Sequence, residues 1–128
     1  MDTGLVVIIL IVTAFVLFYL SKRNRGEVLS PDAFKEKFKN GSGTVIDVRT
    51  ADEYKQGHLK KADYNFDVMS GEFQQQLNKL DKNGTYFLYC RSGSRSGKAA
   101  SLMNKKGFEN VYNIGGFKQL VSAGFDQA

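Results

Sequence analysis

The sequence predicts an α/β domain with a largely parallel central sheet, preceded by one transmembrane helix. Two observations predict this. An almost unbroken apolar block occupies residues 5–20, and from residue 27 onward β-branched or aromatic runs alternate with helical patterns. The mean hydropathy of −0.31 averages these two unlike parts. We therefore divide the chain into a transmembrane anchor (1–21), a basic juxtamembrane linker (22–26) and one folded domain (27–128).

The apolar block has the length and composition of a membrane-spanning helix. Residues 3–21 carry no charge and no proline, and Thr13 is the one polar residue within residues 5–20. At 1.5 Å per residue this segment measures about 28 Å, close to the hydrocarbon thickness of a bilayer. A cleaved signal peptide is less favoured, because no basic residue precedes the block and no small residues end it. A buried core helix is less favoured too, because the block has no polar face.

The charges beside the block predict its orientation. Lys22, Arg23 and Arg25 follow it, whereas Asp2 is the only charged side chain before it. The positive-inside rule then predicts a single-pass membrane protein with its folded domain in the cytoplasm. A single cysteine agrees with a reducing compartment.

The overall charge gives no sign of a nucleic-acid partner. The net charge is +5, and it falls to +3 from residue 26 onward. No basic stripe is interleaved with aromatic residues, so we expect no nucleic-acid binding. The expected macromolecular partner is the membrane itself, through residues 3–21.

Helix caps mark the first half of the folded domain. Ser30 followed by Pro31 is typical of an N-cap and a first helical residue. Thr50 and Glu53 have the spacing of a capping box, and Gly57 can end the short helix that they begin. The elements expected here are a helix over 31–40, a strand over 44–48 and a helix over 50–57.

The second half continues the alternation of strands and helices. Residues 85–89 are apolar or aromatic and uncharged, as expected for the centre of a parallel sheet. Ligands bind such sheets at the carboxyl ends of the strands, which directs attention to the loops after Asp47 and Tyr89. The elements expected here are strands over 64–66, 85–89 and 111–114, and helices over 70–80, 95–106 and 116–123.

The loop after the central strand carries the candidate chemistry. Cys90 ends the strand, and residues 91–94 are basic, small or hydroxylated before a helix begins. Such a loop can turn successive N–H groups toward one point and form an anion site at a helix N-terminus. These donors and the nearby guanidinium groups lower the pKa of a cysteine thiol, which makes its thiolate a nucleophile. A buried structural role for Cys90, and solvated roles for Arg91 and Arg95, are the alternatives, although Arg95 at a helix start needs a nearby anion.

Four motifs in order give the chain its resemblance to a known family. The sequence resembles the rhodanese family in its single-domain form, over residues 29–125. The resemblance implies a rhodanese-like three-layer domain. The matching motifs are CRSGSR at 90–95, DVRTADEY at 47–54, GHL at 57–59, and VYNIGG at 111–116 followed by AG at 123–124.

The resemblance implies sulfur transfer through Cys90. This cysteine would take a sulfane sulfur from a small anionic donor such as thiosulfate, become a persulfide and pass the sulfur to a thiol or to cyanide. Arg95, with support from Arg91, would attract the donor. Asp47 and Arg49 would form a supporting ion pair on the neighbouring loop. The implied substrate-binding residues are Arg91, Ser92, Gly93, Ser94 and Arg95, and we expect neither a metal nor a cofactor.

Two other functions remain open at this stage. The first is a persulfide carrier or sulfide-sensing adaptor at the membrane, with little turnover. The second is a phosphatase, which the spacing disfavours. Related phosphatases and arsenate reductases place five residues between the cysteine and the arginine, whereas here Cys90 and Arg95 enclose four. The shorter loop suits a sulfur atom better than a phosphate.

Overall fold

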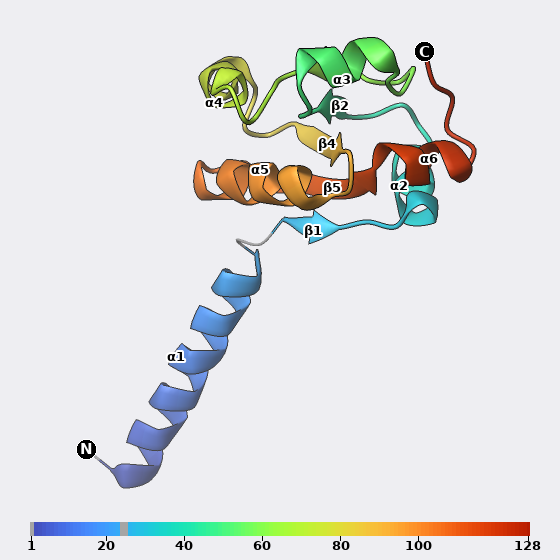
Figure 1. Cartoon of the computed structure of the whole chain (residues 1–128). Helices are drawn as coiled ribbons and strands as arrows, with labels where there is room; N and C mark the ends of the chain where they lie inside the picture. Colours follow the sequence, from blue (N-terminus) through green and yellow to red (C-terminus); the bar gives the residue numbers. More distant parts are fainter. Residues whose placement is uncertain (1, 24–25) are drawn as a thin grey trace.

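The computed structural model describes residues 2–23 and 26–128, in a long N-terminal helix and an α/β domain (Figure 1). Helix α1 (Thr3–Arg23) covers the predicted anchor. Its window Thr3–Leu20 has a mean hydropathy of 2.8 and no buried residue, and it is the one described helix long and apolar enough to cross a membrane. Met1, Asn24 and Arg25, which belong to the predicted anchor and linker, lie outside the described residues.

Five parallel strands form the sheet of the domain. The order is β1-β5-β4-β2-β3, with β4 at the centre, and every pairing is parallel, as predicted. The strands are β1 (Glu27–Val28), β2 (Thr44–Asp47), β3 (Tyr64–Asn65), β4 (Thr85–Cys90) and β5 (Asn110–Gly116). β1 was not predicted from the sequence, because two exposed residues carry no alternating pattern.

Helices cover both faces of the sheet and make three layers (Figure 1). Residues of β4 alternate between the two cores. Leu88 and Cys90 pack with α4 and α5, whereas Phe87 and Tyr89 pack with α2 and α6. The side chain of Cys90 therefore lies on the face of the sheet that α5 covers. The helices are α2 (Pro31–Lys37), α3 (Ala51–Gln56), α4 (Glu72–Gln76), the 3₁₀ helix η1 (Leu77–Lys79), α5 (Ser94–Lys105) and α6 (Phe117–Ser122).

Both predicted helix caps are confirmed. The Ser30 hydroxyl accepts a hydrogen bond from the backbone N–H of Ala33 at 3.1 Å. At the start of α3, the Thr50 hydroxyl accepts from Glu53 N–H at 3.2 Å, and the Glu53 carboxylate accepts from Thr50 N–H at 3.3 Å. The capping box thus fixes Glu53 at the carboxyl edge of the sheet, beside the loop that follows β4.

The helix predicted over 70–80 is present but shorter. It consists of α4, which then tightens into η1. It starts later than predicted because of Asp67, whose carboxylate accepts from Met69 N–H at 2.9 Å and whose carbonyl accepts from Phe73 N–H at 3.1 Å. These bonds hold a turn that ends at Gly71, with φ of 88°. The other predicted element ends differ from the structure by at most three residues.

Candidate functional site

The loop between β4 and α5 is shaped by its own Gly93 and by two glycines at the end of β5. Cys90 ends β4 fully buried, and Gly93 adopts φ of 96° before α5 begins at Ser94. The loop lies against the end of β5. A Cβ atom on Gly116 would come within 2.6 Å of a carbonyl oxygen of the loop, and one on Gly93 would meet Gly115 Cα at 3.4 Å. The paired glycines of β5 therefore make room for the loop.

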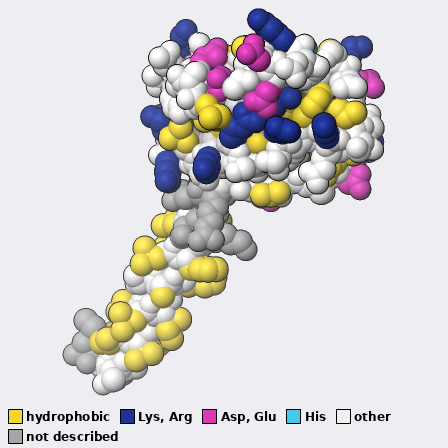
Figure 2. All heavy atoms as spheres, viewed as in Figure 1, with side chains coloured by type: hydrophobic (Ala, Val, Ile, Leu, Met, Phe, Trp, Pro, Cys, Tyr) yellow, Lys and Arg dark blue, Asp and Glu magenta, His cyan; other side chains and the backbone are white. Residues whose placement is uncertain are grey.

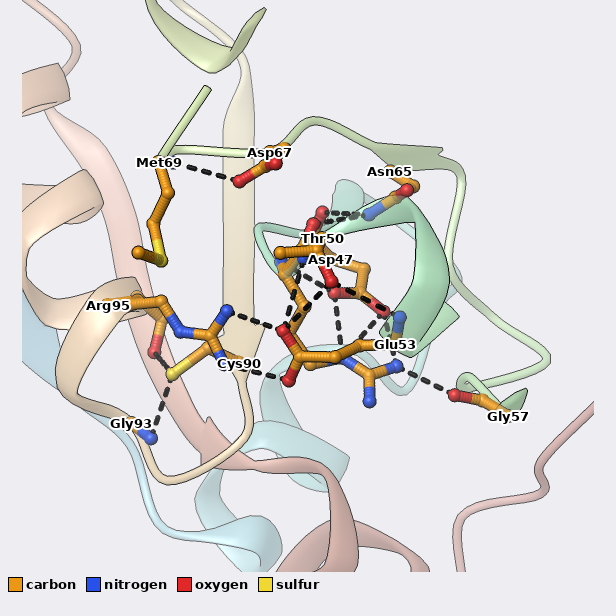
Figure 3. A network of polar contacts seen from close by, with 12 residues as sticks. Asp47, Thr50, Glu53, Gly57, Asn65, Asp67, Met69, Cys90, Gly93 and Arg95 are labelled. Atoms are coloured by element: carbon orange, nitrogen blue, oxygen red, sulfur yellow. Dashed lines mark hydrogen bonds and ion pairs between the residues drawn. The ribbon is translucent and has the colours of Figure 1, made fainter. Parts of the chain in front are cut away.

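The turn directs hydrogen-bond donors at the Cys90 sulfur. The N–H of Gly93 donates to Sγ at 3.0 Å (Figure 3). The Ser96 hydroxyl lies 3.4 Å from the same sulfur. Burial by itself raises the pKa of the Cys90 thiol. The Ser96 hydroxyl and the backbone N–H groups of Ser96, Ser92 and Gly93 outweigh burial, so the net effect lowers the pKa of Cys90.

A buried hydrogen-bond network braces this turn. The Asn113 side-chain amide donates to the carbonyl of Gly93 at 2.9 Å, and its oxygen accepts from Gly115 N–H at 3.0 Å. The same oxygen lies 2.7 Å from the Ser96 hydroxyl. Because a hydroxyl has one proton, Ser96 donates either to Asn113 or to the sulfur of Cys90. The position of the Ser96 proton therefore depends on whether Cys90 is a thiol or a thiolate.

Arg95, which is predicted to attract the donor, is paired with a carboxylate in the structure. Its guanidinium binds Glu53 through Nη1–Oε1 at 2.7 Å and Nη2–Oε2 at 2.9 Å. Figure 3 shows Arg95 between Cys90 and Glu53. The anion that a cation at this helix start needs is therefore a side chain of the protein. The hydrogen bonds from Arg95 lower the pKa of Glu53 to about 2, despite an opposing effect of burial.

Asp47 and Arg49 form the predicted ion pair at the end of β2. Nη2 of Arg49 lies 2.7 Å from Oδ2 of Asp47, and both side chains are buried. The same nitrogen donates to the carbonyl of Gly57 at 2.7 Å, and the guanidinium lies 4.6 Å from the centre of the Phe117 ring. The pair thus joins the loop after β2 to the end of α3 and the start of α6.

The remaining predicted loop residues lie at the surface. Arg91, Ser92 and Ser94 are exposed, on the side of the loop away from the core. Across residues 2–23 and 26–128, no three His, Cys, Asp or Glu side chains gather into a group that could hold a metal ion.

Sequence reasoning missed three residues of this site. Ser96 lies on the same helix face as Ala99 and Met103, so its spacing alone marks it as buried. Asn113 lies near the carboxyl end of β5, where the rule used for Asp47 also applies. Glu53 was assigned to a cap, and nothing local in the sequence indicates its bond to a residue 42 positions away.

Comparison with known proteins decides the family. A sequence model described as "Rhodanese-like domain" matches residues 30–123. The chain belongs to this family. A rhodanese-like fold is also found in a solved "rhodanese with anions from E. coli", which is 29% identical, has a TM-score of 0.59, and is matched over 68% of this chain and 98% of that one. A rhodanese-related protein from Thermoplasma volcanium, at 22% identity and a TM-score of 0.67, covers 80% of this chain and 97% of its own.

The curated relatives of this rhodanese-like chain differ in length. The uncharacterized protein YqhL of Bacillus subtilis is 28% identical over 116 residues, 88% of this chain and 90% of that protein. YrkF of the same organism, named as a candidate sulfur carrier protein, is 33% identical over 67% of this chain and 45% of its own length. A tRNA uridine(34) hydroxylase of Pelagibacter ubique is 34% identical over 75% of this chain and 32% of its own length. The chain thus spans less than half of the last two relatives.

Replacing Ser96 with alanine should raise the pKa of the Cys90 thiol. The substitution removes a hydroxyl that favours the thiolate. Burial, which disfavours the thiolate, is then opposed by the backbone N–H groups alone. Thiolate absorbance in the ultraviolet, followed against pH, measures this directly because the chain has one cysteine. The Ser101→Ala variant removes a hydroxyl further along α5 and serves as control. An unchanged titration midpoint in Ser96→Ala would show that the hydroxyl does not act on the sulfur.

Replacing Glu53 with glutamine should remove a pH-dependent part of the stability. The pKa of Glu53 is about 2 in the folded rhodanese-like domain, below its ordinary 4.5. Its ionised form therefore stabilises the fold above about pH 4.5, and this contribution is lost as the pH falls toward 2. We expect Glu53→Gln to lower the unfolding free energy by about 1 kcal/mol at pH 7.

Denaturant unfolding of the full-length protein in mild detergent, at several pH values, measures this loss. The gap between wild type and Glu53→Gln should narrow as the pH drops below 4.5. Glu36→Gln provides a matched control, because Glu36 lies 3.9 Å from Lys39 with both side chains well exposed. A gap that stays constant down to pH 2 contradicts the assigned role of the Glu53–Arg95 pair.

Proposed function

We propose that this rhodanese-like chain is a sulfurtransferase, anchored to the membrane by α1, with its folded domain in the cytoplasm. The observation that carries the proposal is the Cys90 thiol, buried at the end of the central strand with the N–H of Gly93 3.0 Å from its sulfur. A lowered pKa of Cys90 supplies thiolate, the form that attacks sulfur. Membership of the family supports the same chemistry.

The proposed reaction has two half-reactions. In the first, the Cys90 thiolate attacks the outer sulfur of a small anionic donor such as thiosulfate. The S–S bond of the donor breaks, sulfite leaves with the bonding electrons, and a Cys90 persulfide forms. In the second, a thiol or cyanide takes the outer sulfur and returns Cys90 to thiolate. The backbone N–H groups of the loop stabilise negative charge on sulfur in both steps, as an oxyanion hole does for oxygen.

The loop residues would have different roles in this reaction. Gly93, with the N–H groups of Ser92 and Ser96, stabilises charge on sulfur. Arg91 is exposed and has no ion pair among the described residues, so it can attract an anionic donor. Arg95 contributes by fixing the start of α5 through Glu53 rather than by meeting the donor first. Ser94 lies exposed at the mouth of the loop.

A persulfide carrier with little turnover is the second candidate function. Two observations favour it. YrkF, a relative, is named as a candidate sulfur carrier, and full burial of Cys90 would protect a stored persulfide from solvent. The two candidates differ in kinetics. A carrier would hold a stable persulfide and release it slowly to small thiols and cyanide, whereas a sulfurtransferase turns over many times.

The wild-type protein should gain the mass of one sulfur atom when it is incubated with thiosulfate, and Cys90→Ser should gain none. Serine keeps the size of the side chain but has no low-pKa nucleophile. Intact-mass spectrometry measures the gain, and cyanide added afterward should remove it while thiocyanate forms. Equal loading or turnover in Cys90→Ser would refute sulfur transfer through this residue.

The proposed topology rests on the charges that flank α1. Lys22, Arg23 and Arg25 follow the apolar segment, and Asp2 precedes it. Protease added to the outer face of sealed cytoplasmic membranes should leave the rhodanese-like domain intact, and permeabilisation should expose it. Replacing all three basic residues with glutamate should increase cleavage of the domain by protease added outside. Release of the wild-type chain by alkaline carbonate, or cleavage before permeabilisation, would contradict the proposed anchor or its orientation.

A further inference from the structure

Charged side chains from three parts of the chain gather beside Cys90 (Figure 3). Arg95 lies in the first turn of α5, Glu53 in the first turn of α3, and Asp67 in the turn before α4. The hydrogen bonds to Glu53 raise the pKa of Arg95, despite an opposing effect of burial. Negative charge on Cys90 and on Asp67 raises it further. One guanidinium group is thus shared by two carboxylates and the thiolate.

Glu53 neutralises this guanidinium group. Its two oxygens bind both terminal nitrogens of Arg95, at 2.7 and 2.9 Å. The pKa of Glu53 is about 2, so its carboxylate is ionised at neutral pH. Arg95, Glu53 and Asp67 are one cation and two carboxylates, with a net charge of −1 before Cys90 is counted. On the face of the domain seen in Figure 2, acidic side chains likewise adjoin basic ones.

The charge of the sulfur donor determines the repulsion that it meets at this site. Attack of a thiolate on thiosulfate brings three negative charges together, whereas attack on a singly charged donor brings two. A free guanidinium group would offset one of these charges, but Glu53 already binds Arg95. Arg91, the other cation of the loop, is exposed, so solvent and salt screen its charge. Electrostatic repulsion therefore disfavours the doubly charged donor.

An apolar side chain lies at the same end of the domain. Met69 is 72% exposed, and the carboxylate of Asp67 accepts a hydrogen bond from its N–H. Figure 3 shows the Met69 side chain extending toward Arg95. A flexible thioether can contact the carbon skeleton of an organic donor, which thiosulfate lacks. The charges and the exposed apolar surface beside Cys90 thus suit the same kind of donor, an organic anion with one charge.

We propose that Glu53 is a specificity-determining residue, which shifts the Cys90 site away from doubly charged thiosulfate and toward organic sulfur donors with one negative charge. The inference rests on the proposed sulfur transfer and names the class of donor. Organic persulfides and thiosulfonates belong to this class. Glu53 acts through Arg95, so it is a positioning residue and does not contact the reacting sulfur atoms.

The loading step is balanced without any further reagent. The Cys90 thiolate attacks the outer sulfur of the donor and forms a new S–S bond, while the bond that held this sulfur in the donor breaks. A thiosulfonate releases a sulfinate, an organic persulfide releases a thiolate, and thiosulfate releases sulfite, each with the bonding electron pair. Every donor leaves the same Cys90 persulfide, so the donors differ only in their charge and in the group that leaves.

Two donors that differ by one charge test the inference. Full-length protein in mild detergent is loaded with thiosulfate or with methanethiosulfonate, and intact mass gives the second-order rate constant of each reaction. Glu53→Gln should raise the ratio of these constants, thiosulfate over methanethiosulfonate, about fivefold, because Arg95 is no longer neutralised. Glutamine can still cap α3, so the fold is kept. The increase should shrink in about 1 M salt, where the screening length is about 3 Å.

Three further variants separate charge from structure. Arg95→Gln should lower the same ratio about fivefold. The double variant, with glutamine at both positions, should return the ratio to within about twofold of wild type, because both charges are removed together. Glu36→Gln removes an exposed carboxylate on α2 and should leave the ratio at its wild-type value.

A second readout does not depend on sulfur transfer. Iodoacetate and iodoacetamide alkylate the same thiolate, and they differ by one negative charge. Because the chain has one cysteine, intact mass gives both rates at Cys90, and Glu53→Gln should raise the ratio of acid to amide about fivefold. An unchanged or lower ratio in either assay overturns the inference. Failure of both donors to load Cys90, with the alkylation ratio raised, refutes the proposed function but not the selection by charge.

Discussion

The hydrogen bond from Gly93 N–H to the Cys90 sulfur depends on one left-handed turn, and most of the site depends on that turn. It lets β4 end and α5 begin within four residues, with the first N–H groups of the helix pointing inward. No side chain caps α5, so these donors stay available for a charge on sulfur. The end of β5 maintains the turn, because Asn113 holds the Gly93 carbonyl while the glycine pair at 115–116 leaves room for the loop. A strand far along the chain thus shapes the nucleophile's surroundings.

Two opposing effects determine the state of the thiol. Burial disfavours the thiolate, and the donors around the sulfur favour it more strongly. The largest favourable effects on the thiolate come from the Ser96 hydroxyl and from backbone N–H groups of the loop. The guanidinium group of Arg95 also interacts with the charge on Cys90, while Glu53 holds it in a two-point ion pair. Arg91 and Lys118 are exposed near this loop and have no ion pair among the described residues.

Local signals predicted the fold well, and contacts distant in sequence account for what was missed. The caps at Ser30 and Thr50 and the buried central strand each follow from a few adjacent residues. The helix expected over 70–80 is present as α4 and η1, and it begins late because Asp67 holds a local turn before it. The cysteine loop was predicted from its composition, whereas the bond between Arg95 and Glu53 joins the first turns of α5 and α3, which only the parallel sheet brings together. The place of Asn113 near the carboxyl end of β5 could have been expected, but its bonds to Ser96 and to Gly93 could not.

We propose that the loop after β4 holds the negative charge of a persulfide sulfur, and a crystal structure of the sulfur-loaded protein can test this. We expect an outer sulfur bonded to Cys90 Sγ, within hydrogen-bond distance of the backbone N–H groups of the loop, with Gly93 still in its left-handed conformation. An outer sulfur pointing away from these N–H groups, or a loop that unfolds on loading, would contradict it.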